Sequence, residues 1–508
     1  MTSEFTDNPF KPSSAVTTIN DVFPSEGPIS TLPPELIVGV FQAYSAFDDS
    51  PWRLACVCMR WREIALRSSF LWRHMRLTCG EITDRYVTRW SVPGVGKTIL
   101  TVGRAQVCAE KEELDQAILR SGSSPLDIDI IFSWRTDFES PSYQLLAQDL
   151  LSSIFARRDI CARIEQLGFT LTHSSLDPST FPIPNSLSNL KALEWVSHSP
   201  LWAPSFRQLL PKCKKIAYLH LSFPVLSSLK DVDMWRNVHS LVIHKSGHFN
   251  FSLGARDLDS VIPACPSLKE LKVMPFVAWP RESTPPITCR QLRILKLCCE
   301  ARHLQRIQAP LLTALDAYEL SNSSHQRIED ISLDFPDLET LVVQSPDPRW
   351  IFKFNFTKLK SLGIIIAHES TLMKRVETKV TVWENIFRPN AFPTVQNAQF
   401  EAIGRTSLFM AALASVPNAE RIEIIPDTFQ DSEFGLQLVR QLYAPGTVSM
   451  CGKASHIQFG NRWCCFGVQR ASFEPSLRAL VAIRQGWPTP LQSLRVYWTM
   501  GIEPTEYV

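Results

Sequence analysis

The sequence predicts an α/β protein in which a small helical module precedes a long solenoid of short parallel strands and return helices. Three observations carry this prediction. Two helix-like apolar stripes occupy residues 29–77, and a strand-like apolar pattern recurs about every 24 residues from residue 161 onward. The chain also has 36 prolines against 19 glycines, which is typical of many short elements that end often and not of flexible linkers.

The composition of the 508 residues excludes several classes of protein. Apolar residues make up 45% of the chain, too many for a chain that is disordered throughout. The net charge of only +2 argues against a protein that coats nucleic acid. No apolar run approaches the ~18 residues that span a bilayer, and the first ten residues lack the pattern of a secretory signal. We therefore expect a cytoplasmic and/or nuclear protein that binds neither nucleic acid nor membrane.

The 13 cysteines are expected to be reduced and mostly buried, because no secretory signal directs the chain to an oxidising compartment. No group of cysteines and histidines has the paired CxxC spacing of a zinc site. The sequence therefore predicts no metal and no cofactor.

The chain is expected to divide into four parts. A tail rich in Ser, Thr, Pro and Asn has the composition of a disordered segment, and the helical module follows it. A connector then contains a good helix former, residues 109–119, and the alternating strand pattern of residues 126–130, so it holds the first α/β coils. The expected boundaries are 1–28 for the disordered tail, 29–77 for the helical module, 78–160 for the connector and 161–508 for the solenoid.

The helical module is predicted from two apolar stripes, separated by a stop at Pro51, that indicate three short helices. Pro33 and Pro34 fit a first helical turn, whose amides have no partner within the helix, and Glu35 adds a negative charge at the positive helix end. A module of about 45 residues cannot bury all of these side chains, so some face a partner or pack on the following domain. The stripes contain Leu36, Ile37, Val40, Phe41 and Tyr44, and then Leu54, Val57, Cys58, Trp61, Ile64 and Ala65.

The solenoid is predicted from nine copies of an LxxLxL-like pattern, spaced 20 to 30 residues apart. This spacing is that of leucine-rich repeats, in which each coil must stack on its neighbours to bury its leucines. Short helical segments that end at Pro211, Pro263 and Pro417 would be the return legs. A regular Asn or Cys after the strand is missing, so we expect irregular coils. The copies begin at Ile164, Leu190, Ile216, Val238, Leu268, Leu292, Leu312, Leu338 and Leu359, with weaker copies at Val395, Ala419 and Leu491.

In order and spacing, the helical module resembles an F-box. The matching elements are Leu32-Pro33-x-Glu35-Leu36-Ile37, Val40-Phe41, Val57-Cys58-x-Arg60-Trp61 and Leu71-Trp72. The resemblance covers about 47 of the 508 residues, and together with the repeats it makes the chain similar to fungal F-box proteins. It implies a small three-helix F-box followed by an irregular leucine-rich-repeat solenoid.

This resemblance implies a non-catalytic substrate receptor of an SCF ubiquitin ligase. The F-box would bind a Skp-family adaptor and through it a cullin-RING ligase, and the solenoid would bind an unknown protein substrate. Strand residues such as Tyr218, His220, Lys272, Lys296 and Glu339 would line the substrate-binding face. By the same resemblance, the residues that bind the adaptor or support its binding surface are Leu32, Pro33, Glu35, Leu36, Ile37, Val40, Phe41, Leu54, Val57, Cys58, Trp61, Leu71 and Trp72.

Two alternatives belong to other classes of protein. Gly96, Lys97 and Thr98 fit the end of a phosphate-binding P-loop, which would make the chain an NTPase. However, Ser91 replaces the first glycine of that motif, and neither a buried strand nor a helix pattern flanks it. The second alternative is a leucine-rich-repeat scaffold outside the SCF ligases, whose helical module docks on its own solenoid.

Overall fold

A computed structural model shows two compact units, of which residues 1–76 and 83–126 form the first and residues 77–82 and 127–508 the second. The expected disordered tail and the P-loop-like segment with Gly96, Lys97 and Thr98 lie outside the described residues. The structure describes residues 32–45, 51–79, 106–108, 111–132, 148–149, 151–171, 182–197, 203–222, 233–244, 253–278, 286–299, 301–318, 333–344, 351, 357–365, 387–401, 406–425, 432–460, 470–498 and 504–508.

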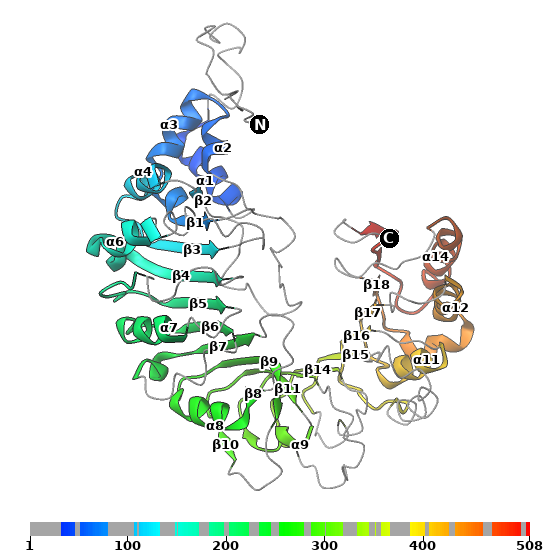
Figure 1. The fold of residues 1–508 in the computed structure, drawn as a ribbon. Helices are drawn as coiled ribbons and strands as arrows, with labels where there is room; N and C mark the ends of the chain where they lie inside the picture. The colour runs from blue at the N-terminus through cyan, green and yellow to red at the C-terminus, as the bar shows by residue number, and fades with distance from the viewer. Residues whose placement is uncertain are drawn as a thin grey trace, which may run out of the picture. The chain divides into compact units, whose positions relative to one another are not determined.

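The three short helices expected in the first unit are present (Figure 1). They are α1 (Pro34–Ser45), α2 (Pro51–Ala55) and α3 (Met59–Arg67), and the 3-10 helix η2 (Ser69–Trp72) and strand β1 (His74–Cys79) follow. The second apolar stripe is not continuous. Cys58 has an extended backbone, and its Sγ caps α3 by accepting a hydrogen bond from the Trp61 amide at 3.5 Å, so the helix axis breaks there.

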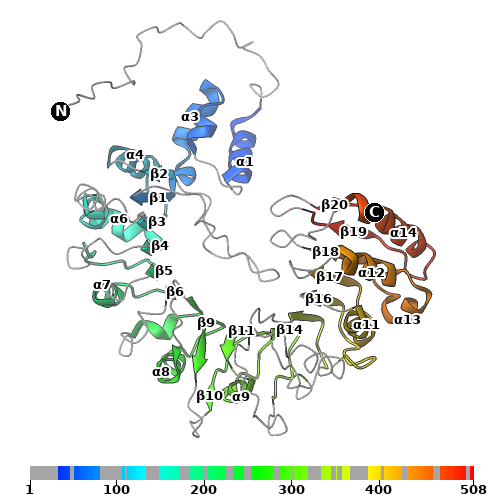
Figure 2. The ribbon, with the colours of Figure 1, turned by 45° about the vertical axis from the view of Figure 1, so that its right-hand side comes forward.

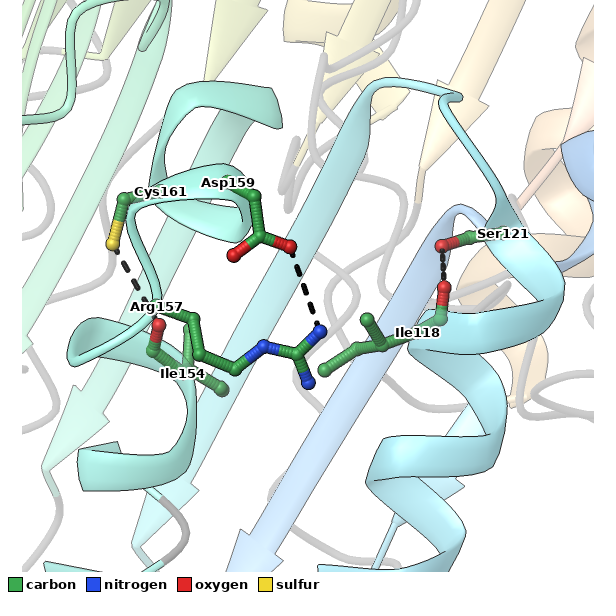
Figure 3. A network of polar contacts seen from close by, with 6 residues as sticks. All are labelled: Ile118, Ser121, Ile154, Arg157, Asp159 and Cys161. Carbon is green, nitrogen blue, oxygen red and sulfur yellow. Dashed lines mark hydrogen bonds and ion pairs between the residues drawn. The ribbon is translucent and has the colours of Figure 1, made fainter.

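Helix α4 (Lys111–Ser121), which follows strand β2 (Gln106–Cys108), completes the first unit. The predicted apolar face is confirmed, because Leu114, Ala117 and Ile118 are all buried. The predicted turn also ends this helix: Gly122 has a left-handed backbone with φ of 54°, which glycine adopts without strain. The Ser121 hydroxyl donates to the Ile118 carbonyl at 2.6 Å in the last turn (Figure 3).

The second unit is built on a long parallel sheet, as the sequence predicts. Except at Ile164, where β4 itself begins, each predicted repeat start lies two residues before its strand. Strand β3 (Leu126–Phe132) belongs to the same sheet and confirms the predicted strand there. Neighbouring strands pair in parallel in the order β4 (Ile164–Leu171), β5 (Ala192–Ser197), β6 (Tyr218–Ser222), β7 (Ser240–His244), β9 (Glu270–Ala278), β11 (Ile294–Cys299), β13 (Ala314–Tyr318), β14 (Thr340–Gln344), β15 (Ser361–Ile365), β16 (Asn397–Glu401), β17 (Arg421–Ile425), β18 (His456–Phe459) and β19 (Ser493–Val496).

Helices cover one side of this sheet (Figures 1 and 2). The core lies between the two layers. The ring centroid of Trp195 on β5 lies 4.7 Å from that of Phe169 on β4 and 5.0 Å from that of Phe206 on α7 (Ala203–Leu209). The alternate strand residues point to the other side, which we call the open face. The helices are α6 (Arg158–Arg163), α7 (Ala203–Leu209), α8 (Ala255–Ala264), α9 (Ala301–Leu304), α11 (Thr406–Ser415), α12 (Ser432–Leu442), α13 (Val448–Cys451) and α14 (Arg470–Arg484), with 3-10 turns η6 (Leu210–Lys212), η8 (Asp233–Asn237) and η12 (Pro445–Thr447).

Two details of the solenoid differ from the sequence prediction. Strand β18 was not predicted, and α8 continues one residue beyond Pro263. Asparagines do join neighbouring coils, although they lie in the turn before the strand and not after it. The side-chain amides of Asn189, Asn237 and Asn418 each donate to a carbonyl of the preceding coil, at 2.7, 3.1 and 2.8 Å.

Small pairings complete the second unit. Strands β10 (Ile287–Thr288) and β12 (Ile307–Gln308) form a separate parallel pair between coils, and β8 (Leu253–Gly254) pairs with the end of β9. At the end of the sheet, β20 (Thr505–Glu506) pairs antiparallel with β19.

Of the nine cysteines whose thiols the structure describes, seven are buried, as the sequence predicts, and Cys56 and Cys58 are exposed. Cys161 donates to the Ile154 carbonyl at 3.7 Å, beside an exposed ion pair between Arg157 and Asp159 (Figure 3). Burial raises the pKa of Cys161 to about 11 and that of Cys213 to about 12. These thiols therefore act as apolar core residues and not as nucleophiles.

Candidate functional site

Helix α1 presents two apolar stripes with different surroundings. Ile37 and Phe41 are fully buried, whereas Leu36 is 56% exposed and Val40 is 44% exposed. Residues four apart lie on one helix face, and neighbours in sequence lie about 100° apart, so each pair forms its own stripe. The helix thus holds its unit together with one stripe and leaves the other uncovered.

A second group of exposed apolar side chains lies where α2 passes into α3. Val57 is 55% exposed and Met59 is 81% exposed, and the thiols of Cys56 and Cys58 are also exposed. The extended backbone at Cys58 turns these residues outward, because it interrupts the helix that would otherwise continue their stripe.

Two contacts hold α1 against the start of α3. The Arg60 Nη2 donates to the Leu32 carbonyl at 2.6 Å, and the rings of Phe41 and Trp61 meet edge to face at 5.0 Å. The first contact ties the beginning of α1 to the first turn of α3. We call Leu36, Val40, Val57 and Met59 the apolar patch.

Other residues of the predicted adaptor-binding set are buried and hold the unit together. Ile37, Phe41, Leu54, Leu71 and Trp72 are all less than 5% exposed. The Trp72 indole donates to the Ala65 carbonyl at 2.9 Å, and the Arg120 guanidinium of α4 lies 4.8 Å from the Trp72 ring centroid. Packing on α4 therefore covers one part of the apolar surface, while the apolar patch stays exposed.

The remaining predicted residues lie at the margin of the patch. Pro33, Glu35 and Cys58 are exposed, and Leu32 and Trp61 are half-buried. The sequence reading missed Met59, which is the most exposed of the large apolar side chains among the described residues. Its neighbour Cys58 belongs to the helical stripe and Met59 does not, so periodicity gave no reason to select it.

The position of this site agrees with a comparison to known families. The model of the F-box-like family matches residues 29–78. Residues 29–78 form an F-box-like domain.

Comparison with whole proteins adds little to this assignment. A crystal structure of a Bacteroides fragilis protein, a structural genomics target, is similar at 12% identity with a TM-score of 0.27. The match covers 46% of this chain and 62% of that chain. No curated protein matches the chain significantly.

The open face of the solenoid is the second candidate surface, and it carries partly buried charges. In register from β5 to β13 lie Glu194, His220, Val242, Lys272, Lys296 and Asp316. Most of these charges are paired: His220 Nδ1 lies 3.0 Å from Glu194, and Lys296 Nζ lies 3.4 Å from Asp316 and 3.0 Å from the Tyr318 hydroxyl. Burial raises the pKa of Asp316 despite the nearby ammonium group of Lys296.

The structure places four of the five predicted face residues on the open face. Tyr218, His220, Lys272 and Lys296 lie on its strands, and Lys272 pairs with Glu270 at 2.6 Å. Glu339 lies outside this face, because it precedes β14 and pairs with Lys360 of the next coil at 3.0 Å.

Among the described residues, no group of three or more His, Cys, Asp or Glu side chains is placed to hold a metal ion. No helix in the described ranges is long and apolar enough to cross a membrane.

Proposed function

We propose that this chain is the substrate-recognition subunit of an SCF-type E3 ubiquitin ligase in the cytoplasm and/or nucleus. The observation that carries the proposal is the apolar patch of the F-box-like domain. F-box domains generally bind Skp-type adaptors, and this domain exposes four large apolar side chains on α1 and at the start of α3, at 44 to 81% of their full area. Clustered exposed apolar side chains are typical of protein-binding surfaces.

Burial of the patch would contribute to the adaptor-binding free energy. Complete burial of one such side chain stabilises a complex by roughly 1.5–3 kcal/mol. These four side chains are still about half exposed, so covering them is worth roughly 3–6 kcal/mol in total before the costs of association. Pro33 and Cys58 would add contacts at the margin, and the buried residues Ile37, Phe41, Leu54, Leu71 and Trp72 would act by holding the helices in place.

The chain would act by proximity and not by chemistry of its own. The adaptor links it to a cullin-RING ligase, and the solenoid holds the target close to the activated ubiquitin, which raises the effective concentration of the reacting groups. The open face, with its partly buried charges, is a surface that could distinguish one target from another, because a partner must supply matching polar groups.

Co-purification with the host's Skp-family adaptor tests the proposal. Leu36→Glu/Val57→Glu places two charges in the apolar patch without removing any buried contact. Leu119→Glu is the matched control, since Leu119 is 72% exposed on α4 and lies outside the patch. We expect the wild type and the control to retain the adaptor, and the double variant to bind at least about 100-fold more weakly, because its carboxylates must be desolvated in the interface.

Circular dichroism should show equal helix content in all three proteins, since every substituted side chain is exposed. A wild-type chain that does not retain the adaptor would contradict the proposal and favour the scaffold outside the SCF ligases. Equal retention by the double variant would show that the adaptor binds elsewhere.

A further inference from the structure

The solenoid has a second ordered surface, at the edge where the strands begin. In the coils of β6 to β13, a buried apolar residue two positions before the strand lies between two residues that are exposed or half-buried. Backbone hydrogen bonds of 2.7 to 2.9 Å join the residues directly before the strands of neighbouring coils into a ladder through Ala217, His239, Lys269, Arg293 and Thr313. Side chains along this ladder are therefore about 4.8 Å apart.

Charge along this edge changes from one coil to the next. On either side of the middle coils, cations are neutralised by an acid in the neighbouring coil: Lys191 lies 2.6 Å from Glu165, and Lys360 lies 3.0 Å from Glu339. Between them, the turns before β6, β7, β9 and β11 carry seven exposed cations, none of which forms an ion pair with a described residue. We call these seven cations the cationic ladder. Lys269 and Arg293 occupy the hydrogen-bonded positions themselves. The other five lie earlier in the same turns: Lys212, Lys214, Lys215, Arg236 and Arg290.

Two acidic side chains that the structure describes in these coils, Glu270 and Asp259, pair with other cations. Glu270 turns to Lys272 on the open face at 2.6 Å, and Asp259 of α8 pairs with Arg306 at 3.4 Å. Of the seven cations, Lys215 has a neutral partner, the side-chain oxygen of Asn189 at 2.9 Å. Like charges this close repel one another, and the repulsion is relieved when an anionic partner covers them.

We propose that the cationic ladder binds an acidic polypeptide segment of a partner protein. From the coil of β6 to the coil of β13 the edge spans about 19 Å, which matches an extended segment of about six residues at 3.3 Å per residue. Leu311, which is 45% exposed, lies at one end of the ladder in the coil of β13, so a segment that ends in an apolar residue fits the surface. A peptide supplies carboxylates and an apolar side chain together, whereas a nucleic-acid backbone or a lipid headgroup supplies only the charge.

This inference deepens the proposed function, because it gives the chemistry by which the solenoid would recognise its target. It is tested on the full chain without an adaptor. The probe is a fluorescent peptide of about six glutamates followed by a leucine, and fluorescence anisotropy measures its binding at low salt. The same peptide with glutamines, an oligothymidylate and phosphatidylserine vesicles are the comparison ligands.

Lys269→Glu/Arg293→Glu reverses two neighbouring positions of the ladder. The matched control is Arg440→Glu/Lys453→Glu, which changes the net charge equally at two exposed cations of α12 and of the coil before β18. We expect the acidic peptide to bind the wild type and the control with equal affinity. Its affinity for the ladder variant should be at least about tenfold lower, and its affinity for the wild type should fall as the salt concentration rises.

Three results would overturn the inference: equal binding of the glutamine peptide, equal binding to the ladder variant, or ladder-dependent binding of the oligonucleotide or vesicles without binding of the acidic peptide. Adaptor retention by the ladder variant separates the two proposals. If the ladder variant retains the adaptor and binds the acidic peptide like the wild type, the cationic ladder is not the binding site for acidic peptides, and the proposed function is unaffected.

Discussion

Arg484, the last residue of α14, is a buried cation that joins two coils. Its side chain is completely buried, and its two terminal nitrogens donate to the Cys451 carbonyl at 3.2 and 3.3 Å and to the Ala454 carbonyl at 2.9 Å. The guanidinium also lies 3.9 Å from the ring centroid of Trp487. These bonds satisfy the carbonyls at the end of α13 and at the start of the β18 coil.

Arg484→Met removes these donors but keeps a long apolar side chain. It relieves the burial of a charge, but the Ala454 carbonyl stays buried and loses the Arg484 donor. The Cys451 carbonyl keeps the Ala454 amide as a donor at 3.0 Å. One unsatisfied carbonyl costs about 1–3 kcal/mol, so we expect a local loss in that range. A loss of ~2 kcal/mol corresponds to about thirtyfold more frequent opening.

Hydrogen exchange measured peptide by peptide is the appropriate assay, because a solenoid opens coil by coil and not in one transition. Peptides from residues 448–460 and 470–487 should exchange faster in the variant, and those of β4 to β7 should not change. Arg478→Met on the same helix is the control, since its side chain is 73% exposed and pairs with Glu474 at 2.7 Å. Wild-type exchange in Arg484→Met, or an equal effect of the control, would refute the reasoning.

Three further predictions concern other parts of the chain. Trp72→Phe removes the bond to the Ala65 carbonyl and should destabilise the first unit by about 1–3 kcal/mol in thermal melts, whereas an unchanged melting curve would mean that the bond contributes nothing. Burial raises the pKa of Glu401 above its ordinary 4.5, so the folded state binds this proton more tightly than the unfolded state, and the free energy of unfolding falls as pH rises through that range. Glu401→Gln should therefore be more stable than the wild type at pH 7 and lose this advantage below pH 4.5. If the variant is still more stable than the wild type in acid, the difference does not come from the charge of this carboxyl. Iodoacetamide should label the exposed Cys56 and Cys58 in the folded protein, while Cys265 and Cys289, which are buried and have pKa values of about 12, should react only after denaturation; mass spectrometry would detect early labelling of either buried thiol as a failure of the prediction.

Repeat periodicity predicted the solenoid well because its signal is the burial of every second strand residue. The leucines that mark the copies, such as Leu219 and Leu341, are buried between sheet and helices. Strand β18 escaped detection because its coil begins with Ala454, which is fully buried but too small to stand out in the pattern. The asparagine contacts were not predicted for a different reason. The leucine-rich pattern places an asparagine after the strand, whereas Asn189, Asn237 and Asn418 lie before their strands.

The F-box-like domain could be located from the sequence, but its exposed apolar residues could not be distinguished from its buried ones. Leu36 and Ile37 are similar in hydrophobicity and adjacent in the helix, so no periodicity separates the exposed residue from the buried one. What separates them is the direction from which α3 packs, which depends on the Arg60 bond and the Phe41–Trp61 contact. Which residues of the second stripe are exposed and which are buried likewise depends on the extended backbone of Cys58, and the amino-acid composition does not reveal this conformation.

The last strand of the sheet has a consequence for self-association. A parallel sheet of many strands would end in a row of unpaired N–H and C=O groups, onto which a strand of another molecule could add. Strand β20 occupies part of this row on β19, and its Glu506 carboxylate is held by Arg495 at 2.6 Å. Because β20 is only two residues long and carries this charged residue, it offers a poor template in its turn. Residues 505–506 thus cover part of this edge, and a chain cut before them would leave β19 open to pairing with a strand of another molecule.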